Sequence, residues 1–421
     1  MTTTLTATST DPASYEALSL RFAPLFAQIG AGALKRDLDR ELPFEEVEAL
    51  DAAGFGALLV PASAGGIGVS IETFIRLLID LAEADSNVAH LYRGHVGFVT
   101  SLKYQPEHIQ QRWYREVLNG KTVGNASTER GGNALGTLNT VLTKGGNGWE
   151  INGTKYYSTG TIFSDYTRVS ASQEGGGRRF AVVNLSAPGV SIEDDWDGFG
   201  QKLTGTGTTV LNGVPVDEDA VLERVPGGSD AIFEASFFQL VLLAVLAGIA
   251  RAARRDAVST IAARKRTFNT GSGLPFREDP LIQEAVGRLS AKAFAAEATV
   301  LQAARALDVA DEASYESGAY SPEFDGQPPY ELSLGEIAVE QAQVIVPELA
   351  MAAAQQLFET VGASATSTSK GLDRHWRNAQ TVATHNPISF RARAIGDFHI
   401  NGTLPEGLNA IGDATKGSAA K

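Results

Sequence analysis

Apolar residues recur at helical spacing in the first part of the chain. From Ile71 to Ala84 they fall on one face of a predicted helix, and Ser70 before it is a good N-cap. Another helix is predicted to begin at Pro43, and the loop between the two, Gly54 to Val69, is rich in glycine. This pattern predicts a helical domain over residues 14–120.

Runs typical of β-strands follow, with frequent Gly and Thr. Phe180 to Leu185 and Thr208 to Leu211 are such runs, and they predict strands. The segment Ile151 to Lys155, with the sequence INGTK, predicts a hairpin turn that leads into a further strand. We expect residues 121–227 to form an antiparallel, barrel-like β domain.

Long apolar stripes return after Gly228 and predict a helical bundle. Its helices are expected over three ranges: 231–267, 279–309 and 333–361. The most apolar stretch, Phe237 to Ala250, is shorter than the about 20 residues that cross a bilayer and contains Gln239, so we expect a helix buried on all sides. The chain is therefore predicted to have an α+β fold that ends in a four-helix bundle, residues 228–421.

Charge and cysteine content narrow the functions that this fold can carry. The chain has 35 Lys and Arg against 49 Asp and Glu, a net charge of −14, which argues against nucleic acid or an anionic membrane surface as a partner. There is no cysteine, which excludes disulfides and cysteine nucleophiles, and the 6 histidines lack the spacing of a metal site. The polar N-terminus has no apolar signal core, so cytoplasm is the expected location.

Several segments, read in this order, resemble the acyl-CoA dehydrogenase superfamily. Gly54 to Gly68 is similar to a glycine-rich family segment, and Asn152 to Gly160 resembles the family's β-domain signature. Other segments resemble one branch, the dibenzothiophene monooxygenases and related sulfur-acquisition oxidoreductases: Gly124–Ser127, Tyr157–Gly160, Asp194–Trp196, Asp373–Asn378 and Thr384–Pro387. The resemblance extends from Phe22 to Pro405 and implies the acyl-CoA dehydrogenase fold.

Resemblance to this branch implies a two-component monooxygenase. Such an enzyme receives reduced FMN from a separate flavin reductase, and FAD is the alternative cofactor. Oxygen adds at C4a of the flavin, and the resulting hydroperoxide transfers one oxygen atom to a small, largely apolar sulfur or nitrogen compound. The resemblance also implies a homotetramer, a dimer of dimers, in which neighbouring subunits complete each flavin site.

A missing carboxylate separates this chain from the dehydrogenases of the superfamily. Those enzymes need a carboxylate that removes the proton alpha to a thioester while the flavin takes hydride. By resemblance, the two places for that base are occupied here by Gln239 and by the segment Thr384 to Pro387, which contains His385. An imidazole with a pKa of about 6.5 can manage the proton of a flavin hydroperoxide. His385 is therefore the candidate catalytic residue, and a loop histidine satisfied by backbone is the alternative.

The resemblance also assigns residues to the flavin ring. Asn125 and Ser127 lie on the segment that passes beneath the ring, and Asn125 is a second catalytic candidate. Thr159 aligns with the family threonine at the flavin N5 edge and is the third catalytic candidate. Ser158 lies beside it in the sequence, and Tyr157 is expected to pack near the flavin ring. The alternative is a structural role: Asn and Ser in a glycine-rich stretch commonly form turns, and Tyr157 and Thr159 would be ordinary side chains of a β-strand.

Two further segments are implied to hold the flavin phosphate. In the family an arginine in the place of Arg266 reaches the phosphate across a subunit boundary, and Phe268 matches a phenylalanine beside the cofactor; alternatively, Arg266 complements the dipole of a helix end. The segment from the other subunit corresponds here to Ser364, Ala365 and Thr366. Relatives in the desulfurising branch carry an arginine in place of Ser364, so either the phosphate is bound less tightly here or the hydroxyl groups of Ser364 and Thr366 hold it.

The substrate side is expected to be formed by the N-terminal helices. His95 lies on the helix that lines the pocket in relatives, with Tyr92 beside it, while His90 does not share the same face. Trp196 is expected to shape the pocket wall. The alternative for His95 is a structural or surface role, and the alternative for Trp196 is an ordinary buried position in the core.

Two other functions remain open at this point. One is an acyl-CoA dehydrogenase-like oxidoreductase with an atypical base, and the other is a flavin-free binding or scaffold protein that kept the fold.

Overall fold

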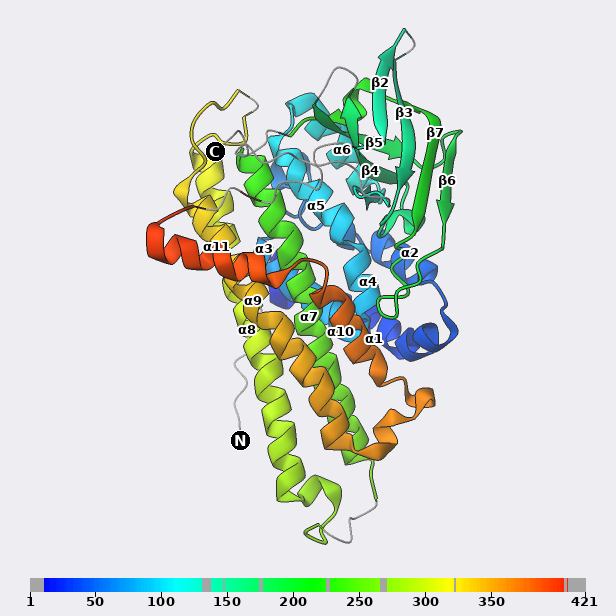
Figure 1. Cartoon of the computed structure of the whole chain (residues 1–421), viewed down its shortest axis with the longest axis vertical. Coiled ribbons are helices and arrows are strands. Elements are labelled where there is room, and N and C mark those ends of the chain that lie inside the picture. The colour runs from blue at the N-terminus through cyan, green and yellow to red at the C-terminus, as the bar shows by residue number, and fades with distance from the viewer. Residues whose placement is uncertain are drawn as a thin grey trace, which may run out of the picture.

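The computed structural model describes residues 11–130, 138–146, 148–173, 177–224, 228–265, 271–321, 323–404 and 407. Helices form the N-terminal part, which packs beside the sheet and the upper half of the long bundle (Figure 1). They are α1 (Tyr15–Asp39), α2 (Phe44–Ala52), α3 (Ile71–Ala84), α4 (Ser86–Leu91), α5 (Arg93–Ser101) and α6 (Glu107–Leu118). The predicted helix from Ile71 to Ala84 is confirmed as α3, and the Ser70 hydroxyl accepts a hydrogen bond from the Thr73 amide at 3.1 Å.

In the central part of the chain, the described residues form one sheet of eight strands. The strands are β1 (Val123–Ala126), β2 (Val141–Gly145), β3 (Gly148–Lys155), β4 (Tyr166–Gln173), β5 (Arg178–Asn184), β6 (Val190–Glu193), β7 (Thr208–Val216) and β8 (Val221–Leu222). Their order is β6-β7-β3-β2-β4-β5-β8, and β1 pairs with β4. The sheet is mixed, because β4 pairs in parallel with both β1 and β2, so the expectation of purely antiparallel pairing is wrong there.

The INGTK segment does not form a turn. It lies within β3, where the register against β7 shifts between Ile151 and Gly153. Gly153 has a φ of 155°, and a side chain at this position would collide with Thr140. The segment is therefore a β-bulge, and the reversal that the sequence placed here occurs between β2 and β3, which pair up to Gly145 and Gly148.

Helices return at Ser229 and form the C-terminal bundle. They are α7 (Ser229–Ala262), α8 (Pro280–Glu316), α9 (Tyr330–Val361), α10 (Asp373–Ala383) and α11 (Ile388–Asn401). The three long helices run side by side along the long axis of the molecule, α10 lies against them, and α11 crosses them (Figure 1). Helix α8 continues beyond its predicted end at 309, and α7 ends before its predicted end at 267.

The helix α7 is covered on nearly all sides. It packs against α3, α8, α9 and α10, and the stretch from Phe237 to Ala250 is buried apart from the half-buried Phe238. Among the described residues, α1, α7 and α9 are long and apolar enough to cross a membrane, but the apolar window of α7 is 100% buried inside the protein. The predicted all-round burial of this stretch is confirmed.

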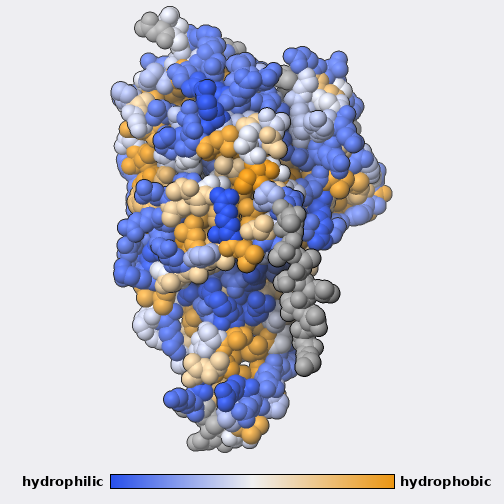
Figure 2. Space-filling model, turned by 180° about the vertical axis from the view of Figure 1, so that it is seen from behind, coloured by the Kyte–Doolittle hydropathy of each residue, from blue (hydrophilic) through white to orange (hydrophobic). Residues whose placement is uncertain are grey.

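The surface mixes hydrophilic regions with apolar patches, as the reverse face shows (Figure 2). Several large apolar side chains on α1, α8 and α11 are at least 67% exposed: Leu20, Leu281, Phe294, Tyr315, Phe390 and Ile400.

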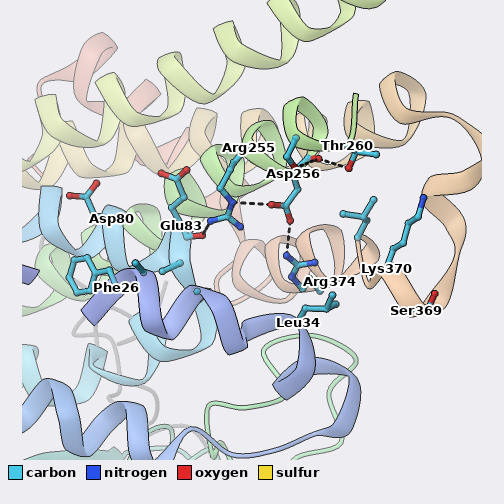
Figure 3. Close-up of a pocket in the computed structure, with 15 residues that line it drawn as sticks. Phe26, Leu34, Asp80, Glu83, Arg255, Asp256, Thr260, Ser369, Lys370 and Arg374 are labelled. Carbon is cyan, nitrogen blue, oxygen red and sulfur yellow. Dashed lines mark hydrogen bonds and ion pairs between the residues drawn. The ribbon is translucent and has the colours of Figure 1, made fainter. Parts of the chain in front are cut away.

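A hollow of about 730 Å³ lies where α1, α3, α7 and α10 meet (Figure 3). Asp256 of α7 lines this hollow, and its carboxylate accepts hydrogen bonds from Arg374 at 2.7 Å and His375 at 2.8 Å. Burial alone would raise the pKa of Asp256, but the neighbouring His375 and Arg374 lower it below its usual range. This carboxylate therefore stays ionised and fastens α10 to α7.

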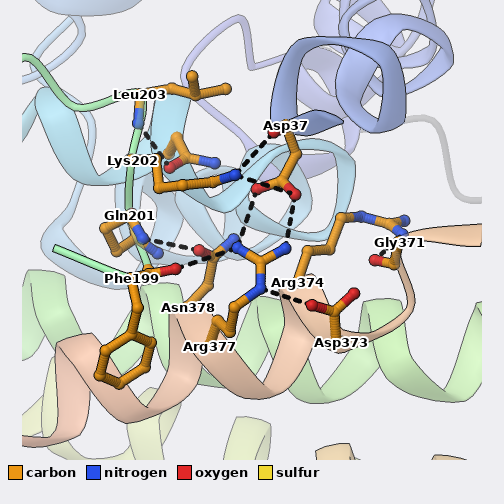
Figure 4. A network of polar contacts seen from close by, with 12 residues as sticks. Asp37, Phe199, Gln201, Lys202, Leu203, Gly371, Asp373, Arg374, Arg377 and Asn378 are labelled. Carbon is orange, nitrogen blue, oxygen red and sulfur yellow. Dashed lines mark hydrogen bonds and ion pairs between the residues drawn. The ribbon is translucent and has the colours of Figure 1, made fainter. Parts of the chain in front are cut away.

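A second polar network joins the three parts of the chain (Figure 4). Arg377 of α10 donates to the Asp37 carboxylate of α1 at 2.6 Å and to the carbonyl oxygen of Phe199, in the loop between β6 and β7, at 3.1 Å. Lys202 of the same loop donates to the Asp37 carbonyl oxygen at 2.8 Å. The network holds the loop between α1 and α10.

Replacement of Arg377 by leucine should destabilise the fold. It would leave the Asp37 side chain, which is 2% exposed, with only Lys202 at 3.7 Å as a counter-ion. We expect a loss of about 2–3 kcal/mol in the free energy of unfolding, measured by urea denaturation. Arg288→Leu is the control, because the pair of Arg288 with Glu284 is exposed on α8 and should contribute less than about 0.5 kcal/mol. Equal losses in both variants would contradict a role for the network.

Candidate active site

A cavity of about 460 Å³ lies between the sheet and the C-terminal helices. It brings together the three predicted catalytic residues, Asn125 of β1, Thr159 of the loop after β3, and His385 of the loop after α10. Ser127, Tyr157 and Trp196, which the sequence also assigned to the site, line the same cavity.

Hydroxyl and amide groups form the wall on the sheet side. The Ser127 hydroxyl donates to the Asn125 amide oxygen at 3.2 Å. The Thr159 and Thr206 hydroxyls are 2.7 Å apart, and that of Thr206 is 2.8 Å from the Thr204 hydroxyl. This wall offers neutral hydrogen-bond donors and acceptors, which suit the polar edge of a planar heterocycle.

A glycine in α5 permits this wall to lie close to the helices. A Cβ at Gly94 would lie 2.8 Å from the Asn125 Cβ and 3.0 Å from its backbone nitrogen. Any side chain here would push α5 away from β1, so glycine sets the position of Asn125 relative to α5.

His385 lies at the opposite side, with a defined tautomer. The Asn386 amide nitrogen lies 3.1 Å from His385 Nδ1 and donates to the Gln239 side-chain oxygen at 2.8 Å. Nδ1 therefore accepts a hydrogen bond, and the ring hydrogen is on Nε2. Desolvation and the nearby Arg93 and His90 hold the pKa of His385 well below its usual value. At neutral pH this imidazole is uncharged and donates from Nε2.

His90 of α4 is a functional candidate that the sequence analysis placed on a different face. Its Nδ1 lies 3.2 Å from the side-chain oxygen of Gln201, so Nδ1 carries the hydrogen and Nε2 is free to accept. Burial, with a smaller contribution from Arg93, lowers the pKa of His90 to about 4. The cavity thus contains one neutral histidine that donates from Nε2 and another that accepts at Nε2.

Gln201 is held by contacts from both helical parts. Its backbone amide donates to the Asn378 side chain at 2.7 Å, and its side-chain nitrogen donates to the Ser86 hydroxyl at 3.3 Å. It has a φ of 50°, in the left-handed region that few non-glycine residues adopt. A glutamine inside a glycine-rich loop was the sequence signal that could have identified it.

The structure corrects the assignment of His95 and Tyr92 to the pocket. His95 is buried in the N-terminal core, where its Nε2 lies 3.0 Å from the Gly56 carbonyl oxygen and its Nδ1 accepts from the Val123 amide at 3.1 Å. The Tyr92 hydroxyl donates to Asp51 at 2.6 Å. These hydrogen bonds hold both side chains against the N-terminal part and β1, so that they do not line the cavity.

Among the described residues that line the cavity, the only carboxylate is Glu234 of α7. The Arg168 guanidinium binds it through two hydrogen bonds of 2.9 and 3.1 Å. Burial alone would raise the pKa of Glu234, but Arg168 and Arg224 lower it. This carboxylate is engaged by its partners and is a weak base.

Comparison with known proteins identifies the family. Models for the N-terminal, middle and C-terminal domains of acyl-CoA dehydrogenase match residues 26–121, 125–214 and 240–390. The chain belongs to the acyl-CoA dehydrogenase superfamily. Its predicted membership and fold are therefore confirmed.

Individual relatives lie in the monooxygenase branch. Dibenzothiophene monooxygenase of Mycolicibacterium goodii is 29% identical and covers 86% of this chain and 88% of its own length. The probable FMNH2-dependent monooxygenase SfnC of Pseudomonas putida is 28% identical and covers 94% and 97%. The crystal structure of TdsC from Paenibacillus sp. A11-2 with FMN and indole superposes with a TM-score of 0.81 at 25% identity, over 92% of this chain and 99% of that one.

The other residues that the resemblance assigned to the flavin lie in different surroundings. Tyr157 is 50% exposed, and its ring lies 5.8 Å from that of Trp196. Ser158 is buried behind the cavity wall, where its backbone amide donates to Gly207. Arg266 and Phe268 lie outside the described residues.

The predicted phosphate segment lies on the turn after α9, away from the cavity wall: Ser364, Ala365 and Thr366. The Ser364 hydroxyl accepts from Arg264 at 2.6 Å. An arginine thus contacts this turn from the end of α7, although none is present in the turn itself.

Alanine at Gly94 should destabilise the protein and disturb Asn125. Overpacking against β1 is expected to lower the free energy of unfolding by about 1–3 kcal/mol, measured by urea denaturation. Gly287→Ala is the matched control, since Gly287 is exposed within α8 and a Cβ there meets no atom within 4 Å. That variant should be unchanged or more stable by up to about 1 kcal/mol. Equal behaviour of the two variants would show that α5 and β1 are less closely packed.

Acid should destabilise the fold through His90. Its pKa of about 4 in the folded protein lies below the usual value of about 6.5, so the unfolded chain takes up the proton first. The contribution is fully present above pH 6.5 and is lost, by up to about 3 kcal/mol, as the pH falls toward 4. His90→Gln should lose less stability than the wild type over this range in urea denaturation. Parallel curves for the two proteins would contradict the lowered pKa.

Proposed function

We propose that this protein is an FMN-dependent monooxygenase that receives reduced FMN from a separate flavin reductase. The observation that carries the proposal is the cavity itself, which is lined by the amide of Gln239 and the neutral imidazole of His385, the residues that by resemblance replace the dehydrogenase base. Relatives across nearly the whole chain are monooxygenases, and one neighbouring structure contains FMN.

The residues of the cavity fit a flavin. Asn125, Ser127, Thr159 and Thr206 offer neutral hydrogen-bonding groups along one wall, and the volume of about 460 Å³ lies in the range of small-molecule sites. When bound and reduced, FMN supplies the two electrons that reduce one atom of dioxygen to water while the other enters the substrate. We infer that Ser364 and Thr366 of a neighbouring subunit, with Arg266, hold its phosphate.

The two histidines have complementary roles in proton transfer. His385 donates from Nε2 to oxygen at the reacting centre, and His90 accepts at Nε2. Asn125 and Thr159 orient the reacting groups from the sheet side. Burial, with a smaller contribution from Arg93, lowers the pKa of both imidazoles, so that each is neutral near pH 7.

The substrate class proposed is a small sulfur compound, with a nitrogen compound as the second candidate. The dibenzothiophene monooxygenases support sulfur, and an L-evernosamine nitrososynthase that is 27% identical favours nitrogen. A dehydrogenase would have to use Glu234 as its base, and acyl-CoA turnover abolished by Glu234→Gln would establish that reading.

We further propose a homotetramer in the cytoplasm. The exposed apolar side chains of α1, α8 and α11 support an assembly that covers them. The separation of the phosphate segment from the cavity also supports a site shared between subunits.

Rapid mixing of reduced, FMN-loaded protein with oxygenated buffer tests the function. Return of the oxidised flavin absorbance should be slower than for free reduced FMN and should show a separate early phase. His385→Ala should lose the incorporation of ¹⁸O from labelled dioxygen into dibenzothiophene or another accepted sulfide by at least about 100-fold, the scale of a lost acid–base group. Its affinity for FMN should stay within about threefold, a change of less than one hydrogen bond. Unchanged oxygenation with lost FMN binding would reject the assigned role of His385, and failure of the wild type to bind FMN would reject the function.

A further inference from the structure

Among the described residues that line the cavity, arginines outnumber carboxylates. Three arginines line it: Arg93, Arg178 and Arg224. Glu234, the only carboxylate among its described lining residues, is already bound by Arg168. In a chain with a net charge of −14, a cationic cavity attracts small anions into one place and keeps cations out.

Arg93 is the arginine whose charge the described part of the chain leaves without an ion pair. Its Nε donates to the carbonyl oxygen of Phe238 at 3.1 Å, and its guanidinium carbon lies 4.6 Å from the centre of the Phe238 ring. Burial lowers the pKa of Arg93 to about 10, so the group is charged at neutral pH. The Glu234 carboxylate raises this pKa but is itself bound by Arg168, so Arg93 forms no ion pair with a described residue and an anionic ligand would stabilise its partly buried charge.

The position of Arg93 is fixed from two sides. A Cβ at Gly97 would collide with the Phe238 ring, so glycine lets that ring pack under α5 and support the guanidinium. With Nε bound to the Phe238 carbonyl, both Nη atoms make no hydrogen bond with a described residue. These two parallel donors match the paired oxygens of a carboxylate, sulfinate or sulfonate.

Arg93 is also close to the residues that carry the proposed chemistry. Burial is the largest cause of the lowered pKa values of His385 and His90, and the charge of Arg93 is the second largest. An anion held by Arg93 would therefore lie beside both imidazoles, with its organic part toward Phe238 and the rest of the cavity.

We propose that the substrate of this monooxygenase is a small organic anion whose sulfinate, sulfonate or carboxylate group binds Arg93. This inference rests on the proposed function and narrows it, because it replaces a largely apolar substrate by one with an apolar part and a negative charge. Arg93 acts as the specificity-determining residue.

The FMN phosphate is the other source of an anion for Arg93, and two flavins separate the two cases. Riboflavin lacks the phosphate, so an arginine that binds phosphate would matter for FMN and not for riboflavin. Under the proposal, Arg93→Gln leaves the affinities for FMN and riboflavin both unchanged.

Two probes of nearly equal shape test the proposal on protein loaded with oxidised FMN. Benzenesulfonate and methyl phenyl sulfone differ by one O⁻ in place of CH₃, and their dissociation constants are measured by calorimetry. Wild type should bind the anion at least about tenfold more tightly. Arg93→Gln should weaken benzenesulfonate by about 10- to 100-fold and leave the sulfone unchanged, Arg93→Lys should fall between, and the exposed Arg288→Gln should match wild type.

Several outcomes would overturn the proposal. Equal affinity of the wild type for the two probes would do so without any variant. So would an Arg93→Gln protein that loses FMN but keeps riboflavin, because Arg93 would then bind the phosphate. If the wild type binds no FMN, the same titrations on flavin-free protein still report on Arg93, so failure of the monooxygenase assignment and failure of the anion site are distinguishable.

Discussion

The rest of the structure depends on the burial of one apolar helix. Helix α7 is apolar on all sides in its middle, so it is stable only when other elements cover it completely. α3 covers it from the N-terminal part, and α8, α9 and α10 from the bundle. Near its start this cover is interrupted by Glu234, Phe238 and Gln239, and there the cavity forms. The active site thus lies where the most buried helix of the protein first meets polar partners.

The sequence predicted those features that depend on local chemistry. The helix from Ile71 to Ala84 starts and ends where its cap and apolar face place it. Likewise, the family motifs at Asn125, Thr159 and His385 come together in one cavity. These residues could be named because they lie in short segments that resemble the family when read together in order, although no single segment is specific.

Features set by tertiary packing could not be predicted in the same way. His90 lines the cavity and His95 lies in the core, and which of these two faces meets the cavity is set by packing that the periodic pattern does not reveal. The INGTK segment has the composition of a turn, but pairing with β7 converts it into a bulge inside a strand. The unpaired charge of Arg93 becomes visible only when Phe238, distant in the sequence, is seen beneath it.

The short helix α10 limits which parts of this site can accept substitutions during evolution. Through Asn378 it fixes Gln201, which orients His90, and its C-terminal end leads directly into His385. One helix of 11 residues therefore sets the spacing between the imidazoles of His90 and His385. The opposite wall, built from α5 and α7, can accept substitutions that reshape it for new compounds while the distance between the two imidazoles stays the same. Under the proposed function, the imidazoles and most of the wall that selects the substrate therefore lie on separate parts of the chain, and Arg93 of α5 is a residue that affects both.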